Sequence, residues 1–288
     1  MSGAVQMGYV PPTDSRPPAA GPRWPGWLVA LTVAWAVLLA GLTWFSTRND
    51  PPTVREQRTL TEAGPVVDGA IGELVAAASD GVPAMVPPEV HRGCRVTPFA
   101  DGATLSREVE LAVPGGEERA VLERIAERLP AKWRAGVRVT PDGPRLRADA
   151  GEFVVVQGRP VTDGRIRLAV DTGCRPIGDG YDRPGPGDAG AGAEVGGLAE
   201  ALRALGGAGA GSELAVTAPC PGGGVARTAW SGVGEPGKSP QAALASLAGG
   251  TPVVETPEVY AYRRGGVAVL ADLRPDGVRV AATSGCAG

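Results

Sequence analysis

Histidine, lysine and aromatic residues are scarce in this chain, and the scarcity removes several classes of function. The 288 residues include 1 His, and 5% are aromatic. The single histidine, His91, cannot form a histidine-pair metal site, and no GxSxG motif supplies a serine for a triad that would use it. The glycine-rich runs at 186–197 and 206–211 lack the Lys-Ser/Thr of a phosphate-binding loop. We therefore expect no metal or other cofactor and no catalytic set.

A basic stripe is also missing. Lys132 and Lys238 are the only lysines, and the net charge is −3. A nucleic-acid-binding protein would cluster basic residues on one face, so no nucleic-acid partner is expected.

One stretch, residues 27–45 (WLVALTVAWAVLLAGLTWF), contains no charged residue. At about 1.5 Å per residue it forms a helix roughly 28 Å long, close to the hydrocarbon thickness of a bilayer. Trp24, Trp27, Trp44 and Phe45 flank it as interfacial anchors do. The stretch predicts one transmembrane helix that is not cleaved. A cleaved signal peptide remains the alternative.

The flanking arginines lean slightly toward a cytoplasmic C-terminal part or decide nothing, so the cysteines are used to decide which side of the membrane the chain occupies. Cys94, Cys174, Cys220 and Cys286 all come after the apolar stretch, and none has CxxC spacing. An even number in an exported region predicts two disulfides. The N-terminus is then cytoplasmic and the rest of the chain extracytoplasmic. The alternative is four free thiols in a cytoplasmic domain.

Composition divides the chain into six segments. We expect a disordered proline-rich tail and the apolar helix, then a juxtamembrane linker, an α+β unit, a Gly/Pro linker and a second α+β unit. These segments are 1–26, 27–45, 46–63, 64–177, 178–195 and 196–288.

Residue periodicity predicts the elements of each unit. Strand 105–113 alternates apolar and polar residues, and 117–129 is an amphipathic helix that Pro130 ends. Ser239 and Pro240 predict the start of a helix in the second α+β unit. Each unit is expected to contain an antiparallel sheet.

The two units share one predicted order: helix, strand, Cys, strand, helix, strands, Cys. Their ends align without a gap, IRLAVDTGC at 166–174 over VRVAATSGC at 278–286. We interpret this as a tandem duplication. Chance is the alternative, because Val/Ala/Gly strands resemble one another. Duplication predicts the pairs Cys94–Cys174 and Cys220–Cys286 among the three pairings possible.

Two motifs supply weak candidate site residues. Val170-Asp171-Thr172-Gly173 resembles the hydrophobic-Asp-Thr-Gly signature of aspartic proteases, which implies a second carboxylate at the matching position. That position holds Thr283, so Asp171 is more simply a polar residue at a strand end.

Arg263 and Arg264 stand beside tyrosines at 260 and 262, as residues that bind an acidic sugar or a phospholipid head group would. An exposed edge strand explains the same pattern.

The resulting hypothesis is a single-pass membrane protein of a bacterial envelope. Its duplicated module would bind a protein or cell-wall partner without catalysis. Two alternatives stay open: an envelope hydrolase that uses carboxylates such as Asp171, and a carrier of a lipid or small molecule.

Overall fold

The computed structural model describes residues 25–49, 58–182, 192–207, 214–234 and 237–286. The chain divides into two compact units, Met1–Pro51 and Pro52–Gly288. Most of the predicted tail, and parts of both predicted linkers, lie outside the described residues.

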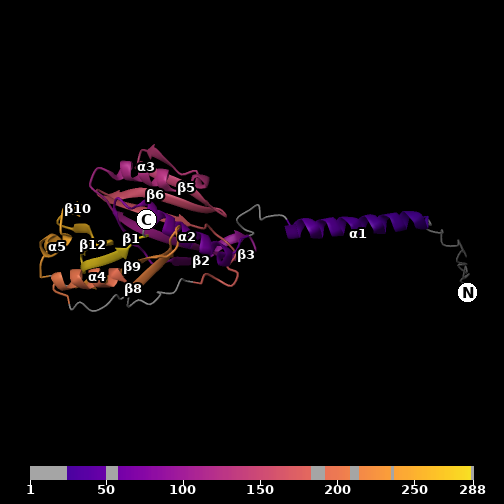
Figure 1. Cartoon of the computed structure of the whole chain (residues 1–288). Helices are drawn as coiled ribbons and strands as arrows, with labels where there is room; N and C mark the ends of the chain where they lie inside the picture. Colours follow the sequence, from indigo (N-terminus) through magenta and orange to yellow (C-terminus); the bar gives the residue numbers. More distant parts are fainter. Residues whose placement is uncertain (1–24, 50–57, 183–191, 208–213, 235–236, 287–288) are drawn as a thin grey trace, which may run out of the picture. The chain divides into compact units, whose positions relative to one another are not determined.

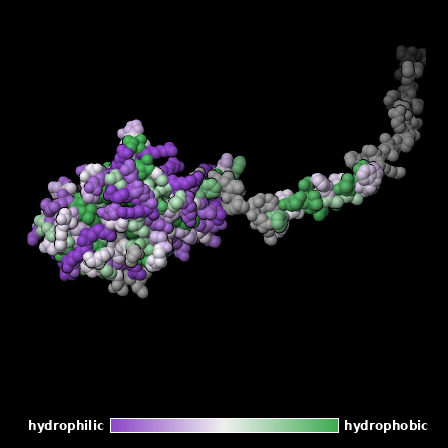
Figure 2. All heavy atoms as spheres, turned by 45° about the horizontal axis from the view of Figure 1, so that its top comes forward, coloured by the Kyte–Doolittle hydropathy of each residue, from purple (hydrophilic) through white to green (hydrophobic). Residues whose placement is uncertain are grey.

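The first unit contains helix α1 (Gly26–Asn49), which is apolar from Gly26 to Phe45. The hydroxyls of Thr32 and Thr43 each donate to a carbonyl one turn earlier, at 2.8 Å. Polar groups satisfied within the helix suit a hydrocarbon environment. Figure 2 shows hydrophobic residues along this helix. Its length and composition fit a membrane anchor and equally a signal sequence.

The second unit contains two antiparallel sheets. The first has the strand order β1-β3-β7-β6-β5-β4, with β2 paired to β3, and the second has the order β10-β11-β12-β13-β9-β8. The strands of the first sheet are β1 (Val82–Met85), β2 (Glu89–Thr97), β3 (Ala100–Ala112), β4 (Gly136–Thr140), β5 (Gly143–Gly151), β6 (Val154–Thr162) and β7 (Arg165–Asp171). Those of the second are β8 (Leu214–Pro219), β9 (Val225–Val233), β10 (Val254–Glu255), β11 (Val259–Arg264), β12 (Val267–Arg274) and β13 (Gly277–Ser284). This is the mixed α+β class that the sequence predicted.

Helices α2 and α3 cover one face of the first sheet, and α4 and α5 cover one face of the second. Within this unit we call residues 58–182, which form the first sheet, the first half, and residues 192–286, which form the second sheet, the second half. In the first half, α2 packs on β3 and β7, and α3 packs on β4 and β5. In the second half, α4 packs on β9 and β13, and α5 packs on β11. Figure 1 shows α4 and α5 on the far side of the second sheet from α2. The helices are α2 (Leu60–Ala77), α3 (Glu118–Arg128), the short 3-10 helix η2 (Ala131–Trp133), α4 (Ala193–Ala204) and α5 (Pro240–Ala248).

Helix α2 lies between the two sheets and belongs to a core that both halves share. One cluster of buried side chains joins Ile71 and Leu74 of α2 to Leu111 of the first sheet and to Trp230 and Leu270 of the second. A smaller cluster fills the space between the second sheet and helices α4 and α5. The two sheets are therefore held together by apolar packing rather than joined only by a linker.

Strand β1 forms the joint between the sheets. It is the edge strand of the first sheet, and it packs against β11, β12 and β13 of the second. The backbone N–H of Met85 donates to Thr228 Oγ1 at 3.1 Å, and Trp230 Nε1 donates to the carbonyl of Met85 at 2.7 Å. Side chains of the second sheet thus satisfy backbone groups that an edge strand leaves unpaired.

Helix α2 begins at Leu60, inside the segment expected as a linker. Thr59 and Glu62 form a capping box, in which each side chain accepts a hydrogen bond from the other residue's backbone N–H. This cap fixes the helix start although Pro65 lies inside the helix.

Gly72 is the point of closest approach between α2 and the second half. A Cβ at this position would lie 1.7 Å from the carbonyl oxygen of Pro219, whereas a Cβ at Gly69 on the same helix would meet nothing within 4 Å. We expect Gly72→Ala to lower the free energy of unfolding by about 1–3 kcal/mol, because backbone has to move. The matched control Gly69→Ala is expected to raise it by roughly 0.5–1 kcal/mol. Urea titration checks both, and equal effects would contradict the packing described.

Candidate binding groove between the two sheets

A groove of ≈ 560 Å³ opens where the outer face of the first sheet meets the second sheet. Its walls come from β3, β7 and the β6–β7 turn on one side and from β10, β11 and β12 on the other. Its lining residues are Glu110, Val161, Thr162, Asp163, Arg165, Ile166, Arg167, Val254, Thr256, Glu258, Val259, Asp272 and Arg274.

A chain of ion pairs crosses the groove from one sheet to the other. Arg165 lies 2.9 Å from a carboxylate oxygen of Glu110 and 3.2 Å from one of Asp272. Asp272 also contacts Arg274 at 2.6 Å, and Arg279 lies 3.9 Å from Glu110. The side chain of Arg165 is 12% exposed, and those of Glu110 and Asp272 are 19% and 12% exposed.

Positive and negative side chains alternate along this chain of ion pairs. Glu110 and Asp272 are each engaged by two guanidinium groups. Partly buried charges arranged in this way hold two elements in fixed register. The groove is therefore suited to polar binding, with Arg167 and Arg274 in its lining.

A second hollow of ≈ 380 Å³ lies on the second sheet and shares Arg274 with the groove. The guanidinium of Arg279 lies over the ring of Trp230, 3.8 Å from the centroid. A guanidinium stacked on an aromatic face keeps its edge N–H groups available to a ligand. The lining residues are Leu214, Trp230, Ser231, Gly232, Val233, Gly234, Arg274, Asp276, Gly277, Val278 and Arg279.

Asp171 ends strand β7, and its carboxylate accepts a hydrogen bond from the backbone N–H of Gly173 at 2.6 Å. Gly173 has a φ of 62°, which glycine adopts without strain. At the matching position of the second half, Thr283 is buried and shares a 2.9 Å hydrogen bond with Thr228. This local geometry explains the Asp-Thr-Gly sequence as a turn at a strand end.

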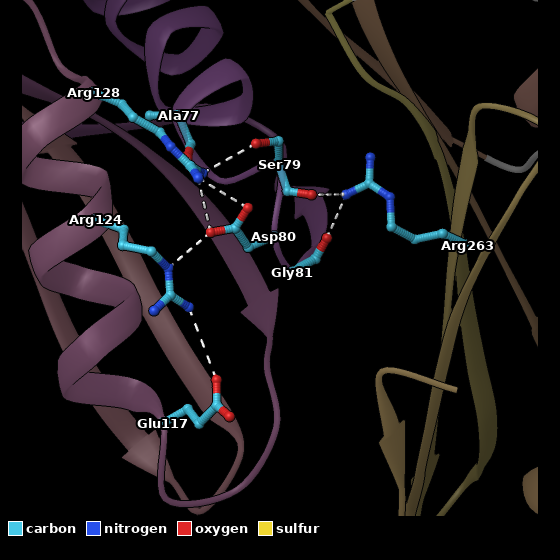
Figure 3. A network of polar contacts seen from close by, with 8 residues as sticks. All are labelled: Ala77, Ser79, Asp80, Gly81, Glu117, Arg124, Arg128 and Arg263. Carbon is cyan, nitrogen blue, oxygen red and sulfur yellow. Dashed lines mark hydrogen bonds and ion pairs between the residues drawn. The ribbon is translucent and has the colours of Figure 1, made fainter. Parts of the chain in front are cut away.

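Arg263 reaches from β11 to the loop between α2 and β1. It donates to the carbonyls of Ser79 and Gly81 at 2.7 and 2.6 Å (Figure 3). Arg264 lies on the opposite face of the strand, 3.7 Å from Glu200. The two arginines suggested by sequence therefore do not converge on one site, and Arg263 links the two halves.

Tyr262 does not join Arg263 in a surface site. The tyrosine is buried with the second-half helices, and this burial raises its pKa to about 12. Arg263, its neighbour in the strand, points to the other face of the sheet.

The same α2–β1 loop is held from the other side by helix α3. Asp80 accepts from Arg124 Nε at 2.8 Å and from Arg128 at 3.0 Å, and Arg128 also donates to the carbonyl of Ala77 (Figure 3). The hydrogen bond from Arg128 is the main cause that lowers the pKa of Asp80 below its usual 3.8.

Replacing Asp80 with asparagine is expected to make stability less dependent on pH in acid. A carboxyl whose pKa is lowered by folding stabilises the native state above its unfolded pKa, and that contribution is lost as pH falls through the folded pKa. The site is partly exposed, so we expect a loss of about 1 kcal/mol at pH 7. Thermal unfolding of both proteins should differ at pH 7 and converge below pH 3.8. A difference that stays constant down to strong acid would contradict this role.

The four cysteines form two disulfides, Cys94–Cys174 and Cys220–Cys286, as the duplicated order predicted. His91 lies 3.1 Å from a carboxylate oxygen of Glu89 on an exposed strand. Within the described ranges, no group of three His, Cys, Asp or Glu side chains is placed to hold a metal ion.

Sequence reasoning missed the residues that cross the groove. Alternation places Glu110 correctly on the polar side of its strand. Its pairing with the other sheet is a long-range contact, which the periodicity of one strand does not predict. Asp272 offered one signal, since it interrupts the apolar run VAVLADL of β12.

No family model matches this chain, and neither the curated proteins nor the solved structures include a match.

Proposed function

We propose that this chain is a single-pass membrane protein of a bacterial envelope, with a cytoplasmic N-terminus and an extracytoplasmic domain. The domain binds a protein or cell-wall partner and does not catalyse a reaction. Its groove between the sheets is the binding site.

The observation that carries the proposal is the combination of an apolar N-terminal helix with two disulfides in the domain C-terminal to it. Disulfides persist in oxidising compartments outside the cytoplasm. No free cysteine occurs in the described part of the chain. A helix of this composition delivers the polypeptide C-terminal to it across a membrane, whether the helix stays as an anchor or is removed.

Duplication of one α+β module is the second part of the proposal. If β1 and β2 together are matched to β8, the first sheet reads β1/β2-β3-β7-β6-β5-β4 and the second β8-β9-β13-β12-β11-β10. Helices α2 and α4 precede these strands, and α3 and α5 occupy the same place within them. Each half carries one of the disulfides.

The two carboxylates that bridge the sheets, Glu110 and Asp272, are engaged in ion pairs, which favours binding over chemistry at that position; Asp163 and Glu258 also line the groove. The two walls of the groove belong to different sheets, and both carry arginine. A polar partner between them can accept hydrogen bonds from both walls. A binding role requires only that these side chains keep their register.

Site-directed photo-crosslinking in intact cells tests the proposed site. A photoreactive residue at Val161, which lines the groove and is 47% exposed, should form an adduct with the partner. The matched control is the same residue at Arg203, an exposed position on α4. Adducts from Val161 alone are expected. The absence of adducts from Val161, or equal adducts from both positions, would overturn the proposed groove.

A further inference from the structure

Arginines line up across four neighbouring strands of the first sheet. Arg138 of β4 is directly opposite Arg145 of β5, and Arg159 of β6 is directly opposite Arg167 of β7. The pairing of Leu146 with Gly158 places Arg145 opposite Arg159 as well. The four therefore form one row perpendicular to the strands, which we call the arginine row.

The row lies on the face of the sheet that the helices leave uncovered. The residues next to these arginines in sequence, such as Leu146, Gly158 and Leu168, are buried on the side of α2 and α3. Side chains alternate along a strand, so the arginines project from the opposite face. Arg138 and Arg159 are exposed, and Arg147 adds a further exposed cation beside the row.

The charge of the row is only partly balanced by the protein itself. Arg145 lies 3.5 Å from Asp142 and Arg167 lies 3.4 Å from Glu108. Among the residues that the structure describes, no ion pair or hydrogen bond is found for Arg138, Arg147 or Arg159. Like charges directly opposite each other on adjacent strands destabilise a sheet. An anionic ligand would relieve this repulsion.

The spacing and the position of the row define the shape of that ligand. Strands about 4.8 Å apart place the first and last arginine of the row about 14 Å apart. Arg167 also lines the groove, so the row runs from the far edge of the sheet into the groove. Glu108 and Glu110 stand on the same face of β3, the next strand beyond β7, and Asp171 stands on that face at the end of β7 itself. A narrow basic strip with an acidic border matches a linear polyanion better than a uniformly anionic membrane surface.

We propose that the arginine row binds a linear phosphodiester polymer of the cell envelope. Each guanidinium can donate two parallel hydrogen bonds to the non-bridging oxygens of one phosphodiester, which remains charged at any physiological pH. Successive phosphates of one strand of polymer then occupy successive arginines. This inference rests on the proposed function for its extracytoplasmic partner and names the chemistry of that partner.

Binding of a synthetic poly(glycerol phosphate) to the full chain in zwitterionic nanodiscs tests the proposal. Removal of one exposed charge contact typically lowers affinity by a factor of about two to five. Arg138→Gln with Arg159→Gln should therefore weaken binding about tenfold. The matched control, Arg203→Gln with Lys238→Gln, removes two exposed cations of the second half and should change affinity less than twofold. Affinity should also fall as salt rises.

A stability measurement separates loss of binding from loss of folding. The Arg138/Arg159 variant removes like-charge neighbours, so its Tm should not fall below that of the parent. Equal affinity of the row variant and its control, or binding to anionic lipid nanodiscs with no binding to the polymer, would overturn the inference. If the chain crosslinks a partner at Val161 but does not bind the polymer, this inference is overturned and the proposed function stands.

Discussion

Asp68→Ala is expected to lower the free energy of unfolding by about 3–5 kcal/mol, because it leaves a buried arginine without its carboxylate. Arg107 is 1% exposed and pairs with Asp68, and its other terminal nitrogen donates to the carbonyl of Thr217 at 2.8 Å. The hydroxyl of Tyr181 donates to the same carboxylate at 2.7 Å. This cluster joins α2, β3 and β8, so removing the carboxylate weakens the packing between the two halves.

A double variant distinguishes the loss of a contact from the burial of an unpaired charge. Asp68→Ala combined with Arg107→Met removes both charges and leaves an unbranched apolar side chain at position 107, so most of the lost stability should return. Tyr181→Phe removes one hydrogen bond and should lower the free energy of unfolding by about 1 kcal/mol. Urea unfolding measures all three. A double variant as unstable as Asp68→Ala would show that packing, rather than charge, explains the effect.

Removal of the second disulfide has an effect of comparable size. The Cys220–Cys286 bond closes a loop with a sequence separation of 66, and restricting the unfolded chain in this way contributes about 4 kcal/mol in the loop-entropy model. Cys286 Sγ also lies 3.6 Å from the carbonyl oxygen of Gly72 on α2. Replacing both cysteines with alanine should therefore destabilise the second half and its contact with α2.

The first disulfide provides the matched comparison. Cys94–Cys174 has a separation of 80, so loop entropy predicts nearly the same loss, about 4 kcal/mol. It links the exposed strand β2 to the end of β7. Guanidinium titration of the two double-alanine variants checks both values. A loss below about 1 kcal/mol for either variant would contradict a stabilising role of that bond.

Local signals in the sequence predicted most of the elements. Pro130 and the apolar stripe identified α3, and Ser239 with Pro240 identified the start of α5, where Ser239 Oγ accepts from the N–H of Ala242. Alternation identified β3 and β7. The disulfide pairing came from the repeated order of elements rather than from any local rule.

The elements that were missed depend on distant partners. Strand β1 has four residues and contains Pro83, so neither length nor periodicity distinguishes it from a loop. It is a strand because β3 pairs with one edge and side chains of the second sheet satisfy Met85 on the other.

The candidate site was missed for the same reason. Glu110 and Asp272 are 162 positions apart in sequence, and only the packing of one sheet edge against the other sheet brings them to Arg165. The residues that local motifs suggested have structural roles instead: Asp171 accepts a hydrogen bond within its own turn, and Arg263 donates to the carbonyl of Ser79 in the other half.

Thiol accessibility in intact cells tests the central claim most directly. Free thiols are first blocked with a membrane-permeant maleimide, and the denatured, reduced protein is then labelled with a heavy maleimide. A disulfide-closed extracytoplasmic domain predicts a shift by four labels, and a membrane-impermeant reductant applied to the cells before blocking should abolish the shift. Four thiols blocked at the outset without any reductant would place the domain in a reducing compartment and contradict the account.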